Sequence, residues 1–183
     1  PGPAAGRPGP AGPGEAVANP PRPRPRIYLD CDGVLADFDR GAEAVLGMAP
    51  RRFEARFGLR ACWGRRAPAE AFSGGLELLP DALELYAVVR HRDPVILTGL
   101  PRGGWAEAQK RRWAARHFPG VEVITTSSAL KREHCHPGDV LIDDTVKFRH
   151  LWEKEGGVFI PHVSAAESVA ELRRLGFLEP AAA

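Results

Sequence analysis

The sequence contains few cysteines and no long apolar run. Its three cysteines (Cys31, Cys62 and Cys135) are odd in number and far apart, so we expect no disulfide framework and a reducing, cytoplasmic location. No apolar stretch approaches the ~20 residues that a transmembrane helix needs, so we expect no membrane partner. The sequence also has no Gly-x-x-x-x-Gly-Lys-Ser/Thr loop, which excludes a nucleotide-triphosphate motor built on that phosphate cradle.

Excess basic charge is absent outside the N-terminal segment. The formal net charge is +2, but the segment through Arg26 carries +3 and the remainder sums to −1. Residues 1–25 also hold 9 of the 18 prolines and lack apolar periodicity. We predict a disordered tail over these residues, with a polyproline ligand or a nucleic-acid arm as the sharper alternatives. For the folded body we expect no nucleic-acid partner.

Short apolar runs alternate with helical patterns after residue 26. Strands are predicted at 26–30, 94–98, 121–124, 139–143 and 158–160. Helices are predicted from Pro80-Asp81 (with Leu79, Leu83, Tyr86 and Val89 on one face), over 103–117, after Thr145 as a cap, and after a capping box of Ser164 and Glu167. This alternation predicts an α/β fold, with a Rossmann-like parallel sheet, helices on both faces, and a core formed by residues 26–38 and 80–178.

Residues 39–79 interrupt the alternation directly after the first strand. They carry no strand signal, and glycines and prolines divide them into short helical stretches. The segment is too long for a simple loop, so it predicts a small helical cap inserted after the first strand. Its aromatic residues can line a pocket for a base or form the apolar core that a small helical lid needs; they are Phe53, Phe57, Trp63 and Phe72.

Acidic pairs follow two of the predicted strands. Asp30 and Asp32 belong to an Asp-Cys-Asp-Gly sequence, and strand geometry points both side chains to the same side. Asp143 and Asp144 follow the fourth strand. Four carboxylates at one sheet edge repel one another unless a cation such as Mg²⁺ relieves them. The alternatives are an Asp/Gly-rich turn for the first pair, and a helix-capping Asp beside a solvated one for the second.

Two further signals fit a phosphate ligand. Thr98-Gly99 places a hydroxyl and a backbone N–H after the second strand, although Thr-Gly is also a common turn. Lys131 supplies positive charge before the fourth strand, although a lone lysine is usually solvated.

The order of these features resembles the haloacid dehalogenase (HAD) superfamily. Its four motifs are Asp-x-Asp-Gly, a Thr or Ser after a strand, a Lys and an acidic pair, matched here by 30–33, Thr98, Lys131 and 143–144. Residues 30–38, with 141–144 and 156–159, further resemble the 5′(3′)-deoxyribonucleotidase (cytosolic type C nucleotidase) branch. The resemblance covers the chain from about Arg26 to Leu175.

This resemblance implies a magnesium-dependent phosphoric monoester hydrolase that forms an aspartyl-phosphate. Asp30 would be the nucleophile and Asp32 the general acid and base. Mg²⁺ would be held by the side chains of Asp30 and Asp143 and the backbone carbonyl of Asp32, with Asp144 as a ligand or close support. The phosphoryl oxygens would be held by Thr98, the N–H of Gly99, and Lys131.

The resemblance also implies a nucleotide substrate. Phe38 occupies the position at which the deoxyribonucleotidases stack the base, and Lys110 matches a family lysine that approaches the phosphate. The expected substrate is therefore a (deoxy)nucleoside monophosphate. Alternatives are a sugar phosphate, another small phosphate ester or a nucleic-acid end, and, in a different class, a non-catalytic phosphoacceptor or scaffold module. A homodimer also stays open.

Overall fold

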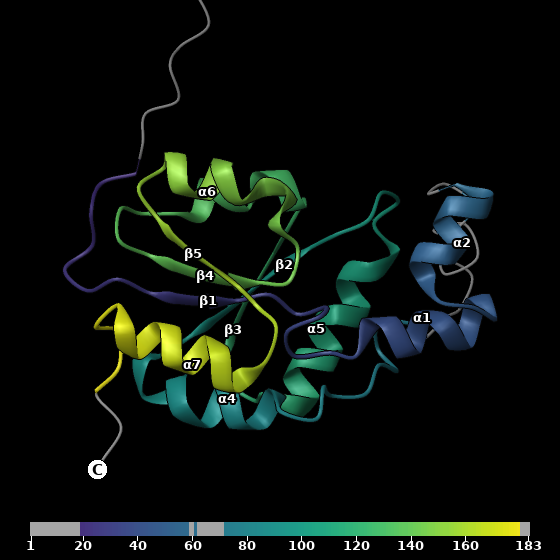
Figure 1. Cartoon of the computed structure of the whole chain (residues 1–183), viewed down its shortest axis with the longest axis horizontal. Helices are drawn as coiled ribbons and strands as arrows, with labels where there is room; N and C mark the ends of the chain where they lie inside the picture. The colour runs from purple at the N-terminus through teal and green to yellow at the C-terminus, as the bar shows by residue number, and fades with distance from the viewer. Residues whose placement is uncertain (1–18, 59–60, 62–71, 180–183) are drawn as a thin grey trace, which may run out of the picture.

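The computed structural model describes residues 19–58, 61 and 72–179 (Figure 1). The strands are β1 (Ile27–Leu29), β2 (Val95–Gly99), β3 (Glu122–Thr126), β4 (Val140–Asp143) and β5 (Val158–Pro161). The α-helices are α1 (Phe38–Leu46), α2 (Pro50–Phe57), α4 (Ala82–Val89), α5 (Trp105–His117), α6 (Arg149–Lys154) and α7 (Ala165–Arg174). The 3-10 helices are η1 (Arg90–Arg92), η2 (Ser128–His134) and η3 (Val146–Phe148). No helix in these ranges is long and apolar enough to cross a membrane.

The five strands form one parallel sheet in the order β3-β2-β1-β4-β5. β1 lies at the centre, where Leu29 is in register with Ile96 of β2 and Ile142 of β4. All five strands therefore end at the same edge of the sheet, and this edge carries the residues that follow β1, β2 and β4. The topology confirms the predicted α/β fold.

Alternation along the strands divides the core between two faces. Ile27 and Leu29 pack in one cluster with residues of α4, α5 and α7, such as Leu85 and Trp113. Tyr28 points to the other face and packs with α6, where its ring meets the Trp152 ring edge-on at 5.4 Å. Figure 1 shows α6 on one side of the sheet and α4 and α7 on the other. Both faces of the sheet are covered by helices, as expected for a parallel sheet with continuous apolar strands.

The buried face of α4 differs from the prediction. Leu83 is 54% exposed, whereas Leu85 is fully buried beside Ala82 and Val89. The reason is that α4 is apolar around most of its circumference, so its own periodicity does not select a face. The packing of α7 against α4 makes that selection.

The predicted helix caps have different outcomes. The capping interaction of Ser164 is confirmed, since its Oγ accepts a hydrogen bond from the Glu167 N–H at 3.2 Å. The predicted Thr145 cap is wrong, because its side chain caps no helix. The Thr145 N–H instead donates to Asp143 Oδ1 at 2.8 Å, and its hydroxyl to Asp144 Oδ1 at 3.3 Å. A side chain expected to start a helix thus lies beside the acidic pair.

The segment after β1 forms the predicted helical cap, with α1 and α2 set to one side of the sheet (Figure 1). Asp37 starts α1 by accepting a hydrogen bond from the Arg40 N–H. Phe53 and Phe72 are buried in the hydrophobic core, so of the two interpretations offered above, these two rings fit packing. Phe57 is 49% exposed, and Trp63 lies outside the described residues.

The predicted N-terminal tail covers residues 1–25, and its first 18 residues lie outside the described part of the chain. Residues 19–25, in contrast, contact the folded body. Asn19 donates hydrogen bonds to backbone carbonyls more than 100 positions later in the chain, and Arg22 forms an ion pair with the buried carboxylate of Asp139.

Candidate active site

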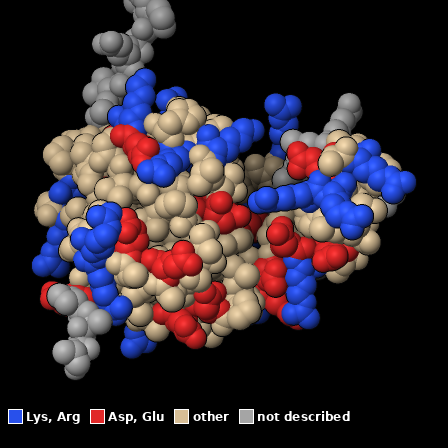
Figure 2. Space-filling model, in the orientation of Figure 1, with Lys and Arg blue, Asp and Glu red and all other residues tan. Residues whose placement is uncertain are grey.

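A cleft of about 790 Å³ lies between the carboxyl edge of the sheet and the helical cap. Asp30, Asp32 and Asp144 line its floor, and Phe38 and Arg51 reach it from α1 and α2. Figure 2 shows acidic side chains gathered at the boundary between the body and the cap, with basic side chains beside them. The cleft therefore has the position expected for a ligand site in a parallel α/β sheet.

A tight turn after β1 positions the first acidic pair. The N–H groups of Leu35 and Ala36 both donate to the Cys31 carbonyl, at 2.9 and 2.8 Å. Gly33 has φ +74°, and a Cβ at this position would lie 2.4 Å from Asp144 Cγ. Only glycine lets this turn approach Asp144 without strain. The turn thus brings the sequence after β1 against the sequence after β4.

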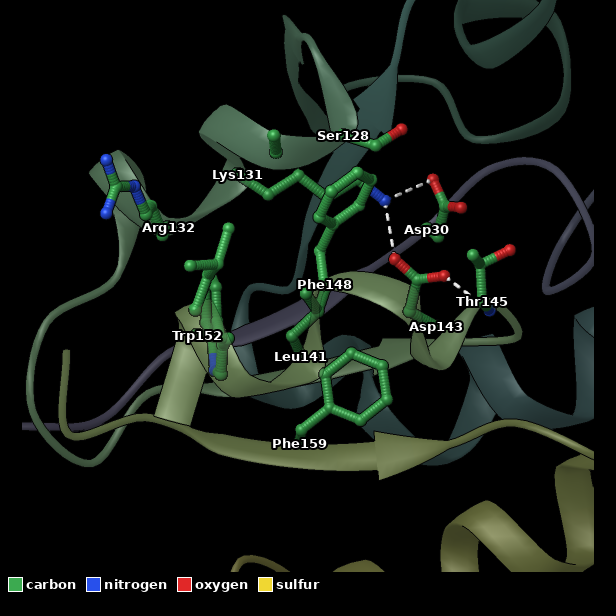
Figure 3. Close-up of a pocket in the computed structure, with 12 residues that line it drawn as sticks. Asp30, Ser128, Lys131, Arg132, Leu141, Asp143, Thr145, Phe148, Trp152 and Phe159 are labelled. Atoms are coloured by element: carbon green, nitrogen blue, oxygen red, sulfur yellow. Dashed lines mark hydrogen bonds and ion pairs between the residues drawn. The ribbon is translucent and has the colours of Figure 1, made fainter. Parts of the chain in front are cut away.

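Lys131 connects the carboxylates that follow β1 and β4. Its Nζ lies 2.9 Å from Asp30 Oδ1 and 2.7 Å from Asp143 Oδ2, and all three side chains are buried (Figure 3). Burial acts to lower the pKa of Lys131, but the Asp30 and Asp143 carboxylates outweigh it and raise this pKa. Lys131 is therefore a permanently charged bridge.

Behind Lys131 lies a small cavity of about 50 Å³ with a largely apolar wall. Figure 3 shows Leu141, Trp152 and Phe159 on this side, and the ammonium group pointing away from them toward the carboxylates. Water has little access from this direction, so the ion pairs experience weak screening. The apolar wall also leaves the carboxylates as the ammonium's natural partners.

Asp30, Asp143 and Asp144 form a cluster, with one oxygen of each lying within 4.8 Å of the others. Burial, followed by repulsion from Asp30, raises the pKa of Asp143 despite the opposing effect of Lys131. Desolvation by the surrounding cluster, followed by repulsion from Asp30 and Asp143, raises the pKa of Asp144 to about 7, although Asp144 is an exposed residue. The cluster holds more negative charge than its lysine neutralises.

Lys110 forms an ion pair with Asp32, the second carboxylate of the turn after β1. Its Nζ donates to Asp32 Oδ2 at 2.7 Å and to Thr98 Oγ1 at 2.8 Å. Burial acts to lower the pKa of Lys110, but the Asp32 carboxylate and its neighbours raise it overall. Asp32 Oδ1 is buried and has no hydrogen-bond partner among the described residues. Lys110 therefore fixes Asp32 through one oxygen and leaves the other available.

The structure brings the sequence-predicted site residues to one place. Lys131 joins Asp30 to Asp143, Lys110 joins Asp32 to Thr98, and Asp144 lies against Gly33. Phe38 and Gly99 line the cleft, and Thr98 is fully buried.

Other cleft residues were not anticipated from the sequence. Ser128 begins η2, with one residue between it and the end of β3, and packs against Gly99, where a Cβ would lie 2.3 Å from the Ser128 Oγ. Its place beyond the carboxyl end of a strand was the available signal. Arg51, Arg102 and Phe148 also line the cleft, and the sequence surroundings of the two arginines match those of ordinary surface residues.

The two described cysteines, Cys31 and Cys135, are buried in the core, and Cys62 lies outside the described residues. Burial raises the pKa of the Cys31 thiol, and the Asp32 carboxylate adds to this, so the thiol stays protonated and unreactive. Cys135 is also buried, and burial raises its pKa to about 12. Within the described ranges, the metal-ligating side chains that converge are Asp30, Asp143 and Asp144, rather than the His-Cys-His sequence at 134–136.

Comparison with known proteins gives a likeness in the fold. A hydrolase from Pseudomonas syringae matches with 12% identity and TM-score 0.50, over 83% of this chain and 99% of that chain. A hydrolase from Streptococcus pneumoniae TIGR4 matches with 15% identity and TM-score 0.50, over 84% of this chain and 98% of that chain. A HAD family hydrolase from Deinococcus radiodurans R1, with bound phosphate and sodium, has 16% identity and TM-score 0.49, over 87% of this chain and 99% of that chain.

Comparison of sequences adds no relative, since no family model matches the chain and no curated protein matches it. The structure and the two matches at TM-score 0.50 thus define a class, namely an α/β protein with a parallel sheet and a capped, acidic cleft at its carboxyl edge.

Proposed function

We propose that this protein is a magnesium-dependent phosphomonoesterase of the HAD superfamily that works through an aspartyl-phosphate. The observation that carries the proposal is the Lys131 bridge between Asp30 and Asp143, with Asp144 within 4.8 Å at the same sheet edge. A structural ion pair needs one carboxylate for one lysine. This arrangement has surplus carboxylates that face an open cleft.

The donor set fits Mg²⁺. Three carboxylates converge, and Asp144 has a pKa of about 7 because burial and its acidic neighbours disfavour its ionised form. A hard divalent cation relieves this repulsion and prefers oxygen ligands. The Asp30 and Asp143 side chains and the Asp32 backbone carbonyl would hold it, with Asp144 as a ligand or close support. When bound, it supplies positive charge that polarises a phosphoryl oxygen.

Asp30 is suited to act as the nucleophile. Its Oδ1 accepts from the Cys31 N–H at 2.8 Å and pairs with Lys131, which fixes the carboxylate. The other oxygen has no hydrogen bond among the described residues and is proposed to attack phosphorus. A new Asp30 O–P bond forms as the ester O–P bond breaks, and the leaving alkoxide takes the departing electron pair.

Asp32 is proposed to carry the proton in both half-reactions. As the acid, it gives its proton to the leaving alkoxide. As the carboxylate, it then accepts a proton from water, whose oxygen bonds to phosphorus while the Asp30 O–P bond breaks. Inorganic phosphate leaves, and both carboxyl groups return to their starting states. The partnerless Oδ1 of Asp32 is the available atom for these transfers.

Three groups are proposed to hold the phosphoryl oxygens: Lys131, the Gly99 N–H and the Thr98 hydroxyl. The Thr98 oxygen already accepts a hydrogen bond from Lys110, which leaves its own hydrogen free to donate. Lysines and fixed N–H groups stabilise the charge that spreads over the phosphoryl group during transfer. Lys110 adds a second positive charge close to this position.

For the substrate we propose a (deoxy)nucleoside monophosphate. The cleft volume of about 790 Å³ falls within the usual range of small-molecule sites. Phe38 lines it at the start of α1 and is held edge-on by the buried Phe72 ring, with centroids 5.6 Å apart. A ring fixed in this way can stack on a base.

The test is phosphate release with Mg²⁺ from deoxynucleoside monophosphates, ribonucleoside monophosphates and sugar phosphates. We expect Asp30→Asn to abolish release. Asp93→Asn is the matched control, because Asp93 is exposed and has φ +49°, which asparagine tolerates well. Equal inertness of the wild type and Asp30→Asn over the whole panel would refute the enzyme proposal.

The other outcomes separate the alternatives. Turnover of sugar phosphates alone would remove the nucleotide assignment and the stacking role of Phe38. Stable phosphorylation of Asp30 by a small phosphodonor, without turnover, would identify a phosphoacceptor module instead.

A further inference from the structure

The segment Asn19–Arg26, which we call the N-terminal strap, lies against the folded body before the chain enters β1. Figure 1 shows it passing along one side of the sheet before β1 begins. The strap does not pair with a strand over this length. Most of its hydrogen bonds are instead made with residues 133–140, from the end of η2 to the start of β4. In addition, Arg26 forms an ion pair with Glu122 at 2.5 Å, and Arg22 Nη2 donates to the Tyr28 hydroxyl at 3.4 Å.

Asn19 makes the first of these contacts. Its side-chain amide donates to the carbonyls of Glu133 and Cys135, at 2.9 and 2.8 Å. The Pro20 carbonyl lies 2.5 Å from His136 Nδ1, which must donate because a carbonyl only accepts. One amide group thus satisfies two carbonyls at the end of η2, where a 3-10 helix leaves carbonyls without helical partners.

The other end of the strap is fixed on Asp139, which is fully buried. Its Oδ1 accepts from the Arg26 N–H at 2.7 Å, and its Oδ2 from the His136 N–H at 3.0 Å. The Arg22 Nε lies 3.6 Å from the same carboxylate. Burial of a carboxylate destabilises the folded state unless the carboxylate is hydrogen-bonded in this way. The strap and the segment before β4 therefore stabilise each other.

The stretch held by the strap is the continuation of the helix that carries Lys131. Lys131 lies in η2 two residues before Glu133, and its ammonium reaches Asp30 and Asp143. A 3-10 helix has weak hydrogen-bond geometry and needs outside support to keep one conformation. The Tyr28 hydroxyl adds some by donating to the His134 carbonyl at 3.1 Å.

We propose that the N-terminal strap is a positioning element for Lys131, with Asn19 as its principal residue. The strap holds the end of η2, and η2 holds the ammonium group between the two carboxylates. Asn19 touches neither substrate nor metal, so its effect passes through the backbone of η2. The catalytic consequence rests on the proposed function, but the structural coupling of Asn19 to Lys131 does not.

The first test measures access to Lys131 without relying on activity. The full chain is treated briefly with an amine-acetylating reagent, and the extent of modification of Lys131 and Lys110 is read by mass spectrometry. Both lysines are almost fully buried, at 4% and 3% exposed, but only Lys131 lies on η2. In Asn19→Ala and Asn19→Asp we expect Lys131 to react roughly threefold to tenfold faster, from the loss of two hydrogen bonds, with Lys110 unchanged.

Two variants sharpen this test. Asn19→Gln keeps the amide donors on a longer stem and should recover part of the protection, whereas the Asn19→Asp carboxylate cannot donate to carbonyls. Arg24→Ala is the control within the strap, since Arg24 is exposed and its side chain has no hydrogen bond or ion pair among the described residues. Unchanged labelling of Lys131 in Asn19→Asp overturns the proposal. An equal rise at Lys110 also overturns it, because it would indicate general loosening.

The second test measures catalysis. With a substrate that the wild type hydrolyses, we expect Asn19→Asp to lower kcat/KM roughly threefold to tenfold, in proportion to the rise in Lys131 labelling, with Asn19→Gln intermediate. Increased labelling with unchanged kcat/KM would overturn the catalytic part of the proposal. If the wild type hydrolyses no phosphate ester, the proposed function fails, while the labelling result still decides whether the strap positions Lys131.

Discussion

Replacement of Lys131 by methionine tests the charge balance of the site most directly. Methionine keeps much of the side-chain volume but leaves the buried Asp30 and Asp143 carboxylates without the ammonium that lies 2.9 and 2.7 Å away. Breaking a buried ion pair in this way costs about 3–5 kcal/mol, because uncompensated charge stays buried. For a chain of this size we expect the melting temperature to fall by about 6–20 °C.

The assay is urea unfolding at pH 7.5 in EDTA, followed by the fluorescence of the buried Trp113 and Trp152. Mg²⁺ should restore more stability to Lys131→Met than it adds to the wild type, because the cation replaces the missing positive charge. Acidification to pH 5 should also reduce the difference, since a proton can then neutralise one carboxylate. Lys154→Met, at an exposed position on α6, should change stability by about 0.5 kcal/mol or less.

Two outcomes would refute this reasoning. If Lys131→Met lost less than about 1 kcal/mol in EDTA, the ammonium would not be compensating buried negative charge. If the loss were the same with and without Mg²⁺, the carboxylates would not form a cation site.

Three further predictions concern the cluster and the core. Asp143→Asn should abolish the rise in melting temperature that Mg²⁺ causes. In the wild type, Mg²⁺ at a hundredfold excess over its Kd should stabilise the folded state by about 2.7 kcal/mol, and thermal unfolding in Mg²⁺ and in EDTA measures the difference. Gly33→Ala should lower the free energy of unfolding by about 1–2 kcal/mol, because Gly33 has a positive φ. It should also weaken Mg²⁺ binding measured by calorimetry, because the new Cβ would lie 2.4 Å from Asp144 Cγ, and unaltered binding would contradict this prediction. His162 is buried, and burial lowers its pKa below the ordinary 6.5, although Asp81 and Glu167 act to raise it. The unfolded chain therefore binds the proton more readily than the folded chain, and the free energy of unfolding should fall as the pH drops through about 6.5. His162→Gln should flatten this fall in urea unfolding between pH 7.5 and 5, and the exposed His150→Gln should not.

The sequence was sufficient to predict the sheet because its strands are short apolar runs bounded by turn residues. The predicted strand at 139–143 and the observed β4 at Val140–Asp143 differ by one residue at one end. The acidic edge followed from the same pattern, because parallel strands place Asp30 and Asp143 at one edge whatever the helices do. The strands and the acidic edge could be predicted because both depend on short sequence patterns and on the parallel direction of the strands.

The predictions that were wrong concern residues whose burial or hydrogen bonding depends on contacts with distant parts of the chain. The apolar periodicity places Leu83 on the buried face of α4, but the helix is apolar on most sides and its packing against α7 buries Leu85 instead. The sequence predicts that Thr145 caps a helix, but its N–H donates a hydrogen bond to the Asp143 carboxylate instead. Asn19 carried no signal, because a proline-rich and arginine-rich segment has the composition of a tail, and its partners are carbonyls of Glu133 and Cys135. Side chains that bond to distant backbone leave no periodic trace in a sequence.

The central position of β1 has a consequence for how the protein is made. β1 is synthesised first, but its partner β4 follows it by 113 residues, as in the bond between Arg26 and Asp139. At ordinary ribosomal rates this delay is roughly 6–23 s, during which the apolar Ile27–Leu29 segment lacks its neighbour β4. The nascent chain therefore needs protection from aggregation over that interval. A chain released before residue 143 would carry Asp30 and Asp32 but could not form the site.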